Sequence, residues 1–583
     1  MRDIDIKNSN LLLKYLDYRG IVTDLLCTNQ DINKLAREEI YNLLEYPPDE
    51  QLGDLALPCF KLSKILRKAP HVIAQELQES LPASPYLEPP KATGPYLNFR
   101  FNPERLAKEV LVSILVNREG YGARPPKGQK IVIDFSAPNI AKPFHVGHLS
   151  STVIGNSLYK IFSFLGYDCV GINHLGDWGT QFGKLITAYK KWGSQSAVEE
   201  GLIKELMRLY VKFHEEAEKE PALEEEAREW FNRIENGDQE ALALWKWFKE
   251  ISLEEFQKVY DLLEIKFDSM AGESFYNDQL PAVVEELKAK GLLKESEGAL
   301  IVDLEQYEMP PCLILKKDGS SLYATRDIAA ALYRKRTYDF TKALYVTGIA
   351  QSLHFRQWFK VIELMGYEWA KDLVHVPFGW VNLEGEKLST RKGKVVLLEE
   401  LLKTAIQKTL EIINEKNPNL ENKEEVARVV GVGAVVFGAL SVNRIKDVTF
   451  SWEEALNFDG ETGPYLQYTH ARACSILRKV AFEPEEHLDF DPKVLTDQAA
   501  LKVIKTLYLF PERIMAAAAE YEPSLISRYL IDLAQEFNRF YHDCPVLVEE
   551  QTLQKARLVL VYAVKTTLAV GLSLLGIKAP ERM

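Results

Sequence analysis

Two histidines, His145 and His148, flank Gly147 where a predicted strand has ended and a predicted helix begins. The strand is the apolar run 130–136, and the helix is 149–166, in which apolar residues recur at helical spacing. The first N–H groups of a helix lack intrahelical partners and can bind phosphate, and a glycine lets the backbone approach a ligand closely. Because ligands of parallel sheets bind at the carboxyl ends of the strands, the spacing predicts a phosphate site. An ordinary helix N-terminus with two incidental histidines is the open alternative.

A second candidate element is the basic loop 385–396, "GEKLSTRKGKVV", which follows the last predicted strand. Cationic side chains on a glycine-containing loop can neutralise a polyphosphate whose charge moves as a bond breaks. The cationic residues are Lys387, Arg391, Lys392 and Lys394. Taken alone, such a segment is more often an exposed basic loop. Together with the histidine motif, it predicts a site for nucleotide phosphates.

These elements belong to a long chain of ordinary globular composition. Its 583 residues exceed what one hydrophobic core organises, so we expect several domains. A net charge of −13 argues against indiscriminate binding to nucleic acid, although it is compatible with a local basic surface. The six cysteines form no C-x-x-C pair, which argues against a disulfide framework and a structural zinc site. We therefore assign no metal ligands.

No segment of the sequence predicts export or membrane insertion. The start, "MRDIDIKNSN", has no cationic stretch leading into an apolar one, so we expect a cytoplasmic protein. The two longest apolar runs are 429–442 and 558–577. The first is too short to span a bilayer and the second is interrupted by Lys565, so both predict buried helices.

The sequence pattern divides the chain into three parts. Residues 1–122 mix helices with short strands and predict an α+β domain, in which Asn102 caps a helix that begins at Pro103. In 123–454 a strand, a helix and a second strand follow one another, which predicts a parallel sheet with a right-handed crossover. Residues 455–583 are almost entirely helical in pattern and predict a separate all-α domain.

The middle part contains a helical stretch and then further strand signals. In about 194–267, glutamates lie opposite Leu, Phe and Trp, which predicts a solvated helical insertion. Four apolar runs then alternate with helices, so we expect the parallel sheet to continue to about residue 381. These runs are "ALIVDL" (299–304), "CLILKK" (312–317), "ALYVTGI" (343–349) and "LVHVPFGWV" (373–381).

The histidine motif and the basic loop together resemble the paired signatures of class I aminoacyl-tRNA synthetases, and within that class the chain resembles an arginyl-tRNA synthetase. The resemblance runs almost end to end and includes the N-terminal stretches "GDLALPCFKLSKILRKAP" and "GPYLNFRF". It rests on seven blocks in order, "SAPNIAKPFHVGHLSSTVIGNSL", "NHLGDWGTQFG", "AREWFNRIENGD", "YATRDIAAA", "LSTRKGKVV", "GETGPYLQYTHARACSIL" and "PERM". It implies an α/β, Rossmann-like parallel-sheet catalytic domain with a helical insertion, an additional N-terminal domain that contacts tRNA, and a helical anticodon-binding domain.

The resemblance also implies a two-step reaction. The arginine carboxylate attacks the α-phosphorus of ATP to give arginyl-adenylate and pyrophosphate, and the arginyl group then passes to the 3′ end of tRNA(Arg). The expected cofactors are ATP and Mg²⁺, with Mg²⁺ accompanying the pyrophosphate. The family often requires tRNA for activation, and we expect the same here. The expected partners are tRNA(Arg), L-arginine and ATP; we expect a monomer that uses neither DNA nor a membrane.

For ATP binding and catalysis, the resemblance implies roles for Lys142, His145, Gly147, His148, Ser389 and Lys392. One departure from the class pattern stands in the basic loop. Thr390 lies where the second, catalytically prominent lysine of the class would be. Arginyl-tRNA synthetases often lack that lysine, and a lysine just before the histidine motif is thought to compensate. Lys142 is that candidate, and Lys392 is a second one.

For arginine binding, the positions that match the family are Asp134, Asn139, His148, Tyr323, Asp327 and Gln351. Their chemistry fits, because a planar guanidinium with five donors needs carboxylates and other acceptors. Asp327 follows Tyr323 by one helical turn, so the carboxylate and the ring could hold the guanidinium from two sides. The structural alternative is a surface helix carrying Tyr323 and Asp327, with Asp134 paired to Arg326 or a lysine.

For tRNA binding, the matching positions are Asn98 and Phe101 in the N-terminal part and Tyr465, Gln467, Tyr468 and Arg472 in the C-terminal helices. Aromatic rings beside basic residues suit stacking on splayed bases. The alternative is that Tyr465 and Tyr468, at helical spacing, pack as core between helices.

Three other functions compete with this interpretation. A class I synthetase for another amino acid would not explain an acidic pocket together with "YATRD". A catalytically idle tRNA-binding relative is favoured by Thr390 and disfavoured by the intact histidine motif. A small nucleotidyltransferase would need neither this length nor the helical C-terminal part.

Overall fold

The computed structural model describes residues 17–49, 51–317, 323–383 and 396–583. The chain forms two compact units, each assembled from separate stretches of sequence. The first unit comprises 1–122, 472–512 and 532–570, and the second comprises 123–471, 513–531 and 571–583.

The N-terminal part of the first unit has the predicted α+β composition. Its three strands form a sheet of order β1-β3-β2, with both pairs antiparallel. Asn102 accepts a hydrogen bond from the Arg105 N–H and caps a helix that begins at Pro103, as predicted. The elements are α1 (Tyr18–Leu26), α2 (Arg37–Leu43), β1 (Leu55–Pro58), α3 (Phe60–Leu66), α4 (Pro70–Ser80), β2 (Lys91–Thr93), β3 (Tyr96–Phe99) and α5 (Pro103–Asn117).

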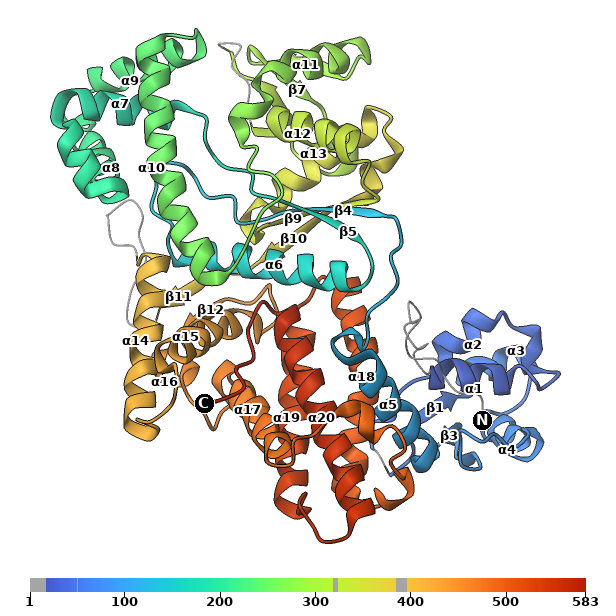
Figure 1. Ribbon diagram of the computed structural model, residues 1–583. Coiled ribbons are helices and arrows are strands. Elements are labelled where there is room, and N and C mark those ends of the chain that lie inside the picture. Colours follow the sequence, from blue (N-terminus) through green and yellow to red (C-terminus); the bar gives the residue numbers. More distant parts are fainter. Residues whose placement is uncertain (1–16, 50, 318–322, 384–395) are drawn as a thin grey trace. The chain divides into compact units, whose positions relative to one another are not determined.

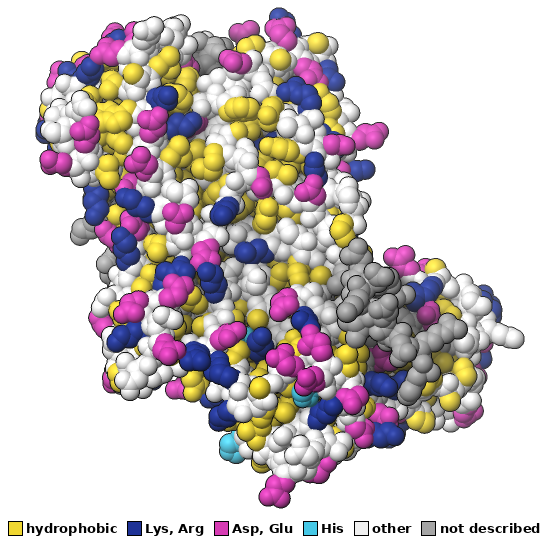
Figure 2. Space-filling model, in the orientation of Figure 1, with side chains coloured by type: hydrophobic (Ala, Val, Ile, Leu, Met, Phe, Trp, Pro, Cys, Tyr) yellow, Lys and Arg dark blue, Asp and Glu magenta, His cyan; other side chains and the backbone are white. Residues whose placement is uncertain are grey.

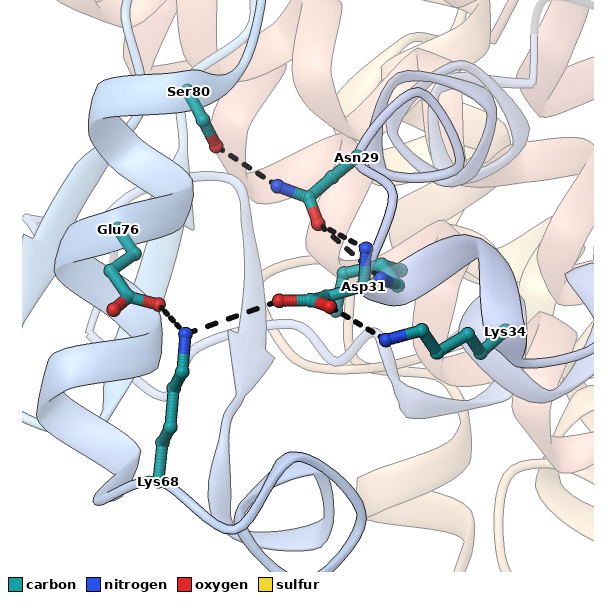
Figure 3. Close-up of polar contacts among 7 residues, drawn as sticks. Asn29, Asp31, Lys34, Lys68, Glu76 and Ser80 are labelled. Carbon is teal, nitrogen blue, oxygen red and sulfur yellow. Dashed lines mark hydrogen bonds and ion pairs between the residues drawn. The ribbon is translucent and has the colours of Figure 1, made fainter.

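Two kinds of contact hold these elements together. In the core, the ring of Tyr18 stacks on Phe101 with centroids 4.0 Å apart. At the surface, Lys68 bridges Glu76 of α4 (2.7 Å) and Asp31 (3.9 Å), as Figure 3 shows. The hydrogen bond from Lys34 holds the pKa of Asp31 below its usual value. Because exposed ion pairs contribute little to stability, the buried rings carry most of the packing energy.

The second unit is built on a parallel sheet of order β10-β9-β4-β5. The strands are β4 (Lys130–Asp134), β5 (Asp168–Ile172), β9 (Lys342–Gly348) and β10 (Leu373–Phe378). Helix α6 (Leu149–Phe164) covers one face, and α12 (Tyr323–Tyr338) and α13 (Ser352–Leu364) cover the other (Figure 1). Strands buried on both faces of a sheet are continuously apolar, and the run "KIVIDFS" has this pattern. The predicted strand–helix–strand unit is confirmed, since β4 and β5 pair in parallel.

The prediction that all four later strand signals join this sheet is wrong for two of them. β7 (Ala299–Val302) and β8 (Cys312–Leu315) pair antiparallel, and β7 also pairs antiparallel with β6 (Leu293–Ser296), in a separate three-stranded sheet. The physical reason lies in the connection, because a parallel crossover needs about a dozen residues or more. The nine residues 303–311 contain only a short 3-10 turn and return the chain antiparallel.

The predicted helical insertion consists of long amphipathic helices. They are α8 (Gln195–Ala217), α9 (Ala222–Glu235) and α10 (Gln239–Leu263), preceded by α7 (Thr180–Trp192) and followed by α11 (Leu280–Ala289). Each of the first three buries an apolar stripe and exposes glutamates, as the sequence pattern indicated.

The remainder of the chain is mostly helical, and the helical pattern predicted for 455–583 is confirmed. It contains α14 (Leu398–Lys416), α15 (Lys423–Leu440), a short parallel pair of β11 (Val381–Leu383) with β12 (Val448–Phe450), then α16 (Trp452–Ala455), α17 (Gly463–Lys479), α18 (Gln498–Glu520), α19 (Ser524–Asp543) and α20 (Gln551–Leu574). Among the described residues, α20 alone is long and apolar enough to cross a membrane, but 83% of its most apolar window is buried, as in a core helix.

The surface carries charges of both signs. On the face shown in Figure 2, lysine and arginine side chains are interspersed with aspartate and glutamate side chains. This distribution agrees with the acidic net charge of −13 and gives that face no extended region of one sign.

Candidate active site

The histidine motif lies where the chain leaves the carboxyl end of β4 and enters α6. Val146–His148 form a single 3-10 turn, with His145 as its N-cap. Nδ1 of His145 accepts a hydrogen bond from the Gly147 N–H (3.0 Å), and Nδ1 of His148 accepts one from the His145 N–H (3.2 Å). Nδ1 of His145 is an acceptor, so Nε2 carries the proton of that ring in the neutral form. Nδ1 of His148 also lies 3.3 Å from the His145 carbonyl, so its role as donor or acceptor depends on the tautomer of the ring. The two ring centroids are 4.2 Å apart.

Burial keeps both imidazoles uncharged at neutral pH. It lowers the pKa of His148 to about 3, with a smaller contribution from His145. Burial, followed by the charge of Lys142, lowers the pKa of His145 below its usual 6.5. The pair can donate hydrogen bonds to phosphate oxygens without changing protonation state.

Gly147 is required by the neighbouring histidine. A Cβ at this position would lie 2.6 Å from Cε1 and 2.9 Å from Nδ1 of His145. Any side chain here would displace the ring and break its hydrogen bond to the Gly147 N–H. The sequence interpretation gave Gly147 the role of making room for ATP; the geometry adds that it makes room for His145.

The loop before the motif is strained and tightly held. Ser136, Ala137 and Ala141 all have positive φ, which costs energy for residues other than glycine. The Ser136 hydroxyl lies 2.8 Å from that of Tyr260, and the Ala141 N–H donates to Ser252, both on α10. Strain of this kind persists only where the surroundings fix it, which is typical of functional sites.

Lys142 lies within this loop and contacts the insertion. Its Nζ is 6.0 Å from the ring centroid of Tyr210 on α8, and burial lowers its pKa. The other lysine candidate, Lys392, lies outside the described residues, as do Ser389 and Thr390.

Described backbone on the C-terminal side of the basic loop joins the histidine motif directly. The Val146 N–H donates to the carbonyl of Val396 (3.1 Å), and the Leu398 N–H donates to the carbonyl of Phe144 (2.9 Å). Two motifs separated by more than two hundred residues in the sequence are thus linked through residues 144–146 and 396–398.

Asp134 forms a buried ion pair. Its carboxylate lies 2.7 Å from Nη1 of Arg334 on α12, with the two side chains 8% and 1% exposed. The partner is neither Arg326 nor a lysine, the two kinds of partner that the sequence alternative considered. The guanidinium also lies 5.6 Å from the ring centroid of Tyr345 on β9.

Three of the remaining arginine candidates, Tyr323, Asp327 and Gln351, lie at the starts of α12 and α13. Tyr323 begins α12 and is 65% exposed, and Asp327 lies one turn further along, as predicted. Oδ2 of Asp327 is 2.5 Å from Nε2 of His354 on α13. Gln351 ends the turn before α13 and is exposed, as is Asn139 in the strained loop. Sequence reasoning missed His354, although its position three residues after Gln351 placed it on the same turn.

Two further acidic residues near these helices were also missed. Glu273 pairs with Arg326 of α12 at 3.2 Å, and burial raises the Glu273 pKa to about 7 against the lowering effect of that arginine. Asp177 is fully buried, 2.5 Å from Nζ of Lys249, and accepts hydrogen bonds from the Ser274 N–H and hydroxyl. Asp177 belongs to the "GDWG" block, so that motif was the available signal.

A cleft of about 940 Å³ opens beside these residues. Tyr323 and Arg326 contribute to one wall, and residues of α9 and α11 contribute to the others. It is large enough for an organic substrate, since small-molecule sites occupy roughly 300–1,000 Å³.

The predicted tRNA-contacting residues differ in exposure. Tyr468 is 41% exposed and Tyr465 is half-buried. Gln467 is fully buried, and its amide donates to the carbonyls of Lys578 (2.8 Å) and Val429 (3.2 Å), so it ties the C-terminal tail to α15. Arg472 donates to the Asn538 side chain. In the first unit, the two predicted residues, Asn98 and Phe101, are 4% and 5% exposed.

The described residues contain no group of three or more His, Cys, Asp or Glu side chains placed to hold a metal ion. The phosphates of ATP supply the hard oxygen ligands that Mg²⁺ prefers.

Models of known families match three successive parts of the chain. Residues 26–101 match the arginyl tRNA synthetase N terminal domain, 110–452 match the catalytic domain of tRNA synthetases class I (R), and 466–583 match the DALR anticodon binding domain. The order is that of the three parts recognised in the sequence.

Comparisons with whole proteins agree. The chain is 57% identical to the arginine–tRNA ligase of Alkaliphilus metalliredigens and 55% identical to that of Halothermothrix orenii, in each case over 97% of this chain and all of the relative. Among solved structures, it is similar to the arginyl-tRNA synthetase of Thermus thermophilus, with a TM-score of 0.82 and 29% identity over 93% of this chain and 96% of that one. The arginyl-tRNA synthetase of Plasmodium falciparum matches with a TM-score of 0.77 and 26% identity over 93% and 94%. The chain belongs to the arginyl-tRNA synthetase family of class I aminoacyl-tRNA synthetases.

Proposed function

We propose that this chain activates L-arginine with ATP and transfers the arginyl group to the 3′ end of tRNA(Arg). The observation that carries the proposal is identity above one half, over nearly the whole chain, to proteins named as arginine–tRNA ligases. In the first step, an arginine carboxylate oxygen bonds to the α-phosphorus of ATP and pyrophosphate leaves. In the second, a terminal ribose hydroxyl of tRNA attacks the arginyl carbonyl and AMP leaves.

The histidine motif would act in the first step by positioning and charge stabilisation. The neutral rings of His145 and His148 lie at the carboxyl end of β4, where parallel sheets bind nucleotides, and His145 carries an Nε2–H donor. Phosphoryl transfer needs little covalent chemistry from the protein, so preorganised donors lower the barrier mainly by fixing the phosphates in line. Burial lowers the pKa of both histidines, which keeps the two rings neutral at neutral pH.

A lysine elsewhere would supply the positive charge that this chain lacks at Thr390, where the class signature has a lysine. Lys142 supports this role because it lies in the strained loop three residues before His145, and burial makes its charge act in a low dielectric. Lys392 remains the second candidate. Mg²⁺ would enter with the phosphates of ATP, and no step requires the protein to hold it.

The arginine side chain would bind beside α12 and α13. The carboxylate of Asp327 can accept charge-assisted hydrogen bonds from the guanidinium, and the exposed ring of Tyr323 can cover the guanidinium plane. Asn139 and Gln351 would complete the hydrogen bonds to the amino acid. Asp134, held by Arg334, would act indirectly by supporting the strand end beneath the site.

The C-terminal helices would read the anticodon. Tyr468 supports this assignment by its exposure, with Tyr465 and Arg472 as neighbours, and base stacking on such rings contributes about 1–3 kcal/mol per base. Gln467, Asn98 and Phe101 would act in tRNA binding only by supporting exposed neighbours. We further propose a monomer that acts in the cytoplasm and has no DNA partner.

The alternatives are a synthetase for another amino acid and a catalytically idle tRNA-binding relative. An aminoacylation assay separates them: purified chain is incubated with ATP, Mg²⁺, total tRNA and each amino acid in turn, and charged tRNA is measured. Charging with arginine alone supports the proposal. Charging with a different amino acid, or tRNA binding without any charging, would overturn it.

A further inference from the structure

A cavity of about 850 Å³ lies in the second unit at the edge of the sheet opposite the histidine motif. Gln129, Tyr167 and Lys342 line it at the starts of β4, β5 and β9, whereas His145 follows the carboxyl end of β4. Residues from Met515 to Tyr521 of α18 and its C-cap close another side. The volume is in the range of small-molecule sites, roughly 300–1,000 Å³.

The charged side chains among the described lining residues of this cavity are all of one sign. They are Arg124, Lys127 and Lys342, and no described Asp or Glu lines the cavity. This local excess of cations stands out on a chain with 84 acidic and 71 basic side chains. A cavity with three cations and no carboxylate in its lining has an attractive potential for an anion.

Each of these cations contacts a neutral group. Nζ of Lys127 lies 3.8 Å from the ring centroid of Tyr167, and Lys342 donates a hydrogen bond to the Tyr521 hydroxyl at 2.7 Å. Nη2 of Arg124 lies 3.4 Å from the sulfur of Met515. The contacts of Lys127 and Lys342 orient the two ammonium groups, and neither contact involves a carboxylate. By contrast, Lys130 on the same edge does not line the cavity and pairs with Asp168.

Most of the remaining lining is apolar, although Gln129 and Thr341 also contribute. Phe162 of α6, Leu165 at the C-cap of α6 and Ile131 of β4 are buried lining residues, and the exposed prolines 125 and 126 form the rim. The proline segment is fixed, because the Arg124 N–H donates to the Phe164 carbonyl (3.0 Å) and the Lys127 N–H donates to the Gly166 carbonyl (2.8 Å). An apolar pocket with a few oriented polar groups is typical of sites for organic ligands.

We infer that this cavity binds a small organic anion with a flat apolar body. The anionic group would contact Lys127, Lys342 and Arg124, and the body would pack against Phe162 and the proline rim. The inference is independent of the proposed function, since it uses no residue of the histidine motif or of the arginine pocket.

The test uses 1-naphthalenesulfonate as the probe, with calorimetric titration into the full chain. We expect one binding site for the sulfonate and no measurable binding of the neutral analogue 1-naphthalenemethanol. The Lys127→Ala/Lys342→Ala double variant should bind the sulfonate at least about tenfold more weakly, because it loses charge-assisted contacts. A second variant, Ala518→Trp, fills the cavity while keeping all three cations, and should also abolish binding.

Lys130→Ala is the matched control and should bind the probe as the unaltered chain does. All variants should keep their ATP–pyrophosphate exchange rate, which separates failure of this site from failure of the proposed function. The inference is overturned if the probe does not bind, if the neutral analogue binds equally, or if Ala518→Trp binds unchanged. The inference is also wrong if the probe does not bind the unaltered chain and the double variant loses affinity for tRNA. That result would show that the two lysines contact an RNA backbone.

Discussion

The Nε2 atom of His354 lies 2.5 Å from Oδ2 of Asp327, which joins the starts of α13 and α12. This hydrogen bond fixes the orientation of the carboxylate that we assign to the arginine guanidinium. An ionised carboxylate has about four lone-pair sites, so one contact with His354 leaves the others for a ligand. His354 therefore positions the Asp327 carboxylate and leaves acceptor sites on it for the arginine guanidinium.

Replacing Asp327 should weaken arginine binding selectively. Asp327→Asn keeps the shape but removes the charge, and hydrogen bonds to charged groups contribute about 1.5–3 kcal/mol, so we expect the KM for arginine to rise roughly 10-fold to 150-fold. The KM for ATP should be nearly unchanged. Pyrophosphate exchange measures both, and Asp303→Asn, at an exposed ion pair with Lys294, is the matched control. An unaltered KM for arginine would exclude Asp327 from the pocket.

Substituting Gly147 should disable catalysis through the adjacent histidine. In Gly147→Ala the new methyl group would lie 2.6 Å from Cε1 of His145, so the ring must move away from its hydrogen bond. We expect a loss of exchange activity of at least about a hundredfold, the effect typical of removing one positioned donor, with the melting temperature little altered. Gly438→Ala on α15, where the nearest atoms lie at 3.6 Å, should be neutral. Full activity of Gly147→Ala would contradict the assigned geometry.

These features show which parts of the site could be predicted from the sequence. The strand, the glycine and the two histidines of the motif are contiguous, so a local pattern reveals them. The partners of Asp134 and Asp327 are not contiguous: Arg334 and His354 come from helices whose packing decides which face they present. The separate sheet containing β7 and β8 was missed for a related reason, because an apolar run does not reveal the direction of its pairing partner.

The stability of the protein should respond to pH through His148. Burial lowers its folded-state pKa from 6.5 to about 3. Between these values the unfolded chain binds a proton that the folded chain does not, so stability falls as the pH falls. His148→Gln removes this titration. We expect the melting temperature of the unaltered chain to fall more steeply than that of the variant between pH 6.5 and about 4. Parallel curves would show that His148 is not buried in its neutral form.

Removing one partner of the ion pair between Asp134 and Arg334 should lower the free energy of unfolding more than removing both partners. Arg334→Met leaves a buried carboxylate without its partner, which costs about 3–5 kcal/mol of the free energy of unfolding. Adding Asp134→Leu removes the stranded charge and should restore most of that loss. Denaturant unfolding of both variants measures the difference. A double variant no more stable than Arg334→Met would contradict the assignment of the loss to an unpaired charge.

Tyr468 should contribute to tRNA binding without affecting arginine activation. Loss of one stacked base costs about 1–3 kcal/mol, so Tyr468→Ala should raise the Kd for tRNA(Arg) by roughly fivefold to a hundredfold. Filter binding or fluorescence anisotropy gives the Kd. Phe275→Ala, at another exposed aromatic residue, is the control. Equal affinity in the Tyr468 variant and the unaltered chain would place the anticodon contact elsewhere.

ATP–pyrophosphate exchange shows whether the chain activates arginine with ATP. The assay is run with each of the twenty amino acids, with and without total tRNA, on the unaltered chain and on His148→Ala. We predict exchange with arginine alone, a sharp rise when tRNA is added, and its loss in a folded His148→Ala variant. Exchange with another amino acid, or none with any amino acid in a folded sample, would contradict the account.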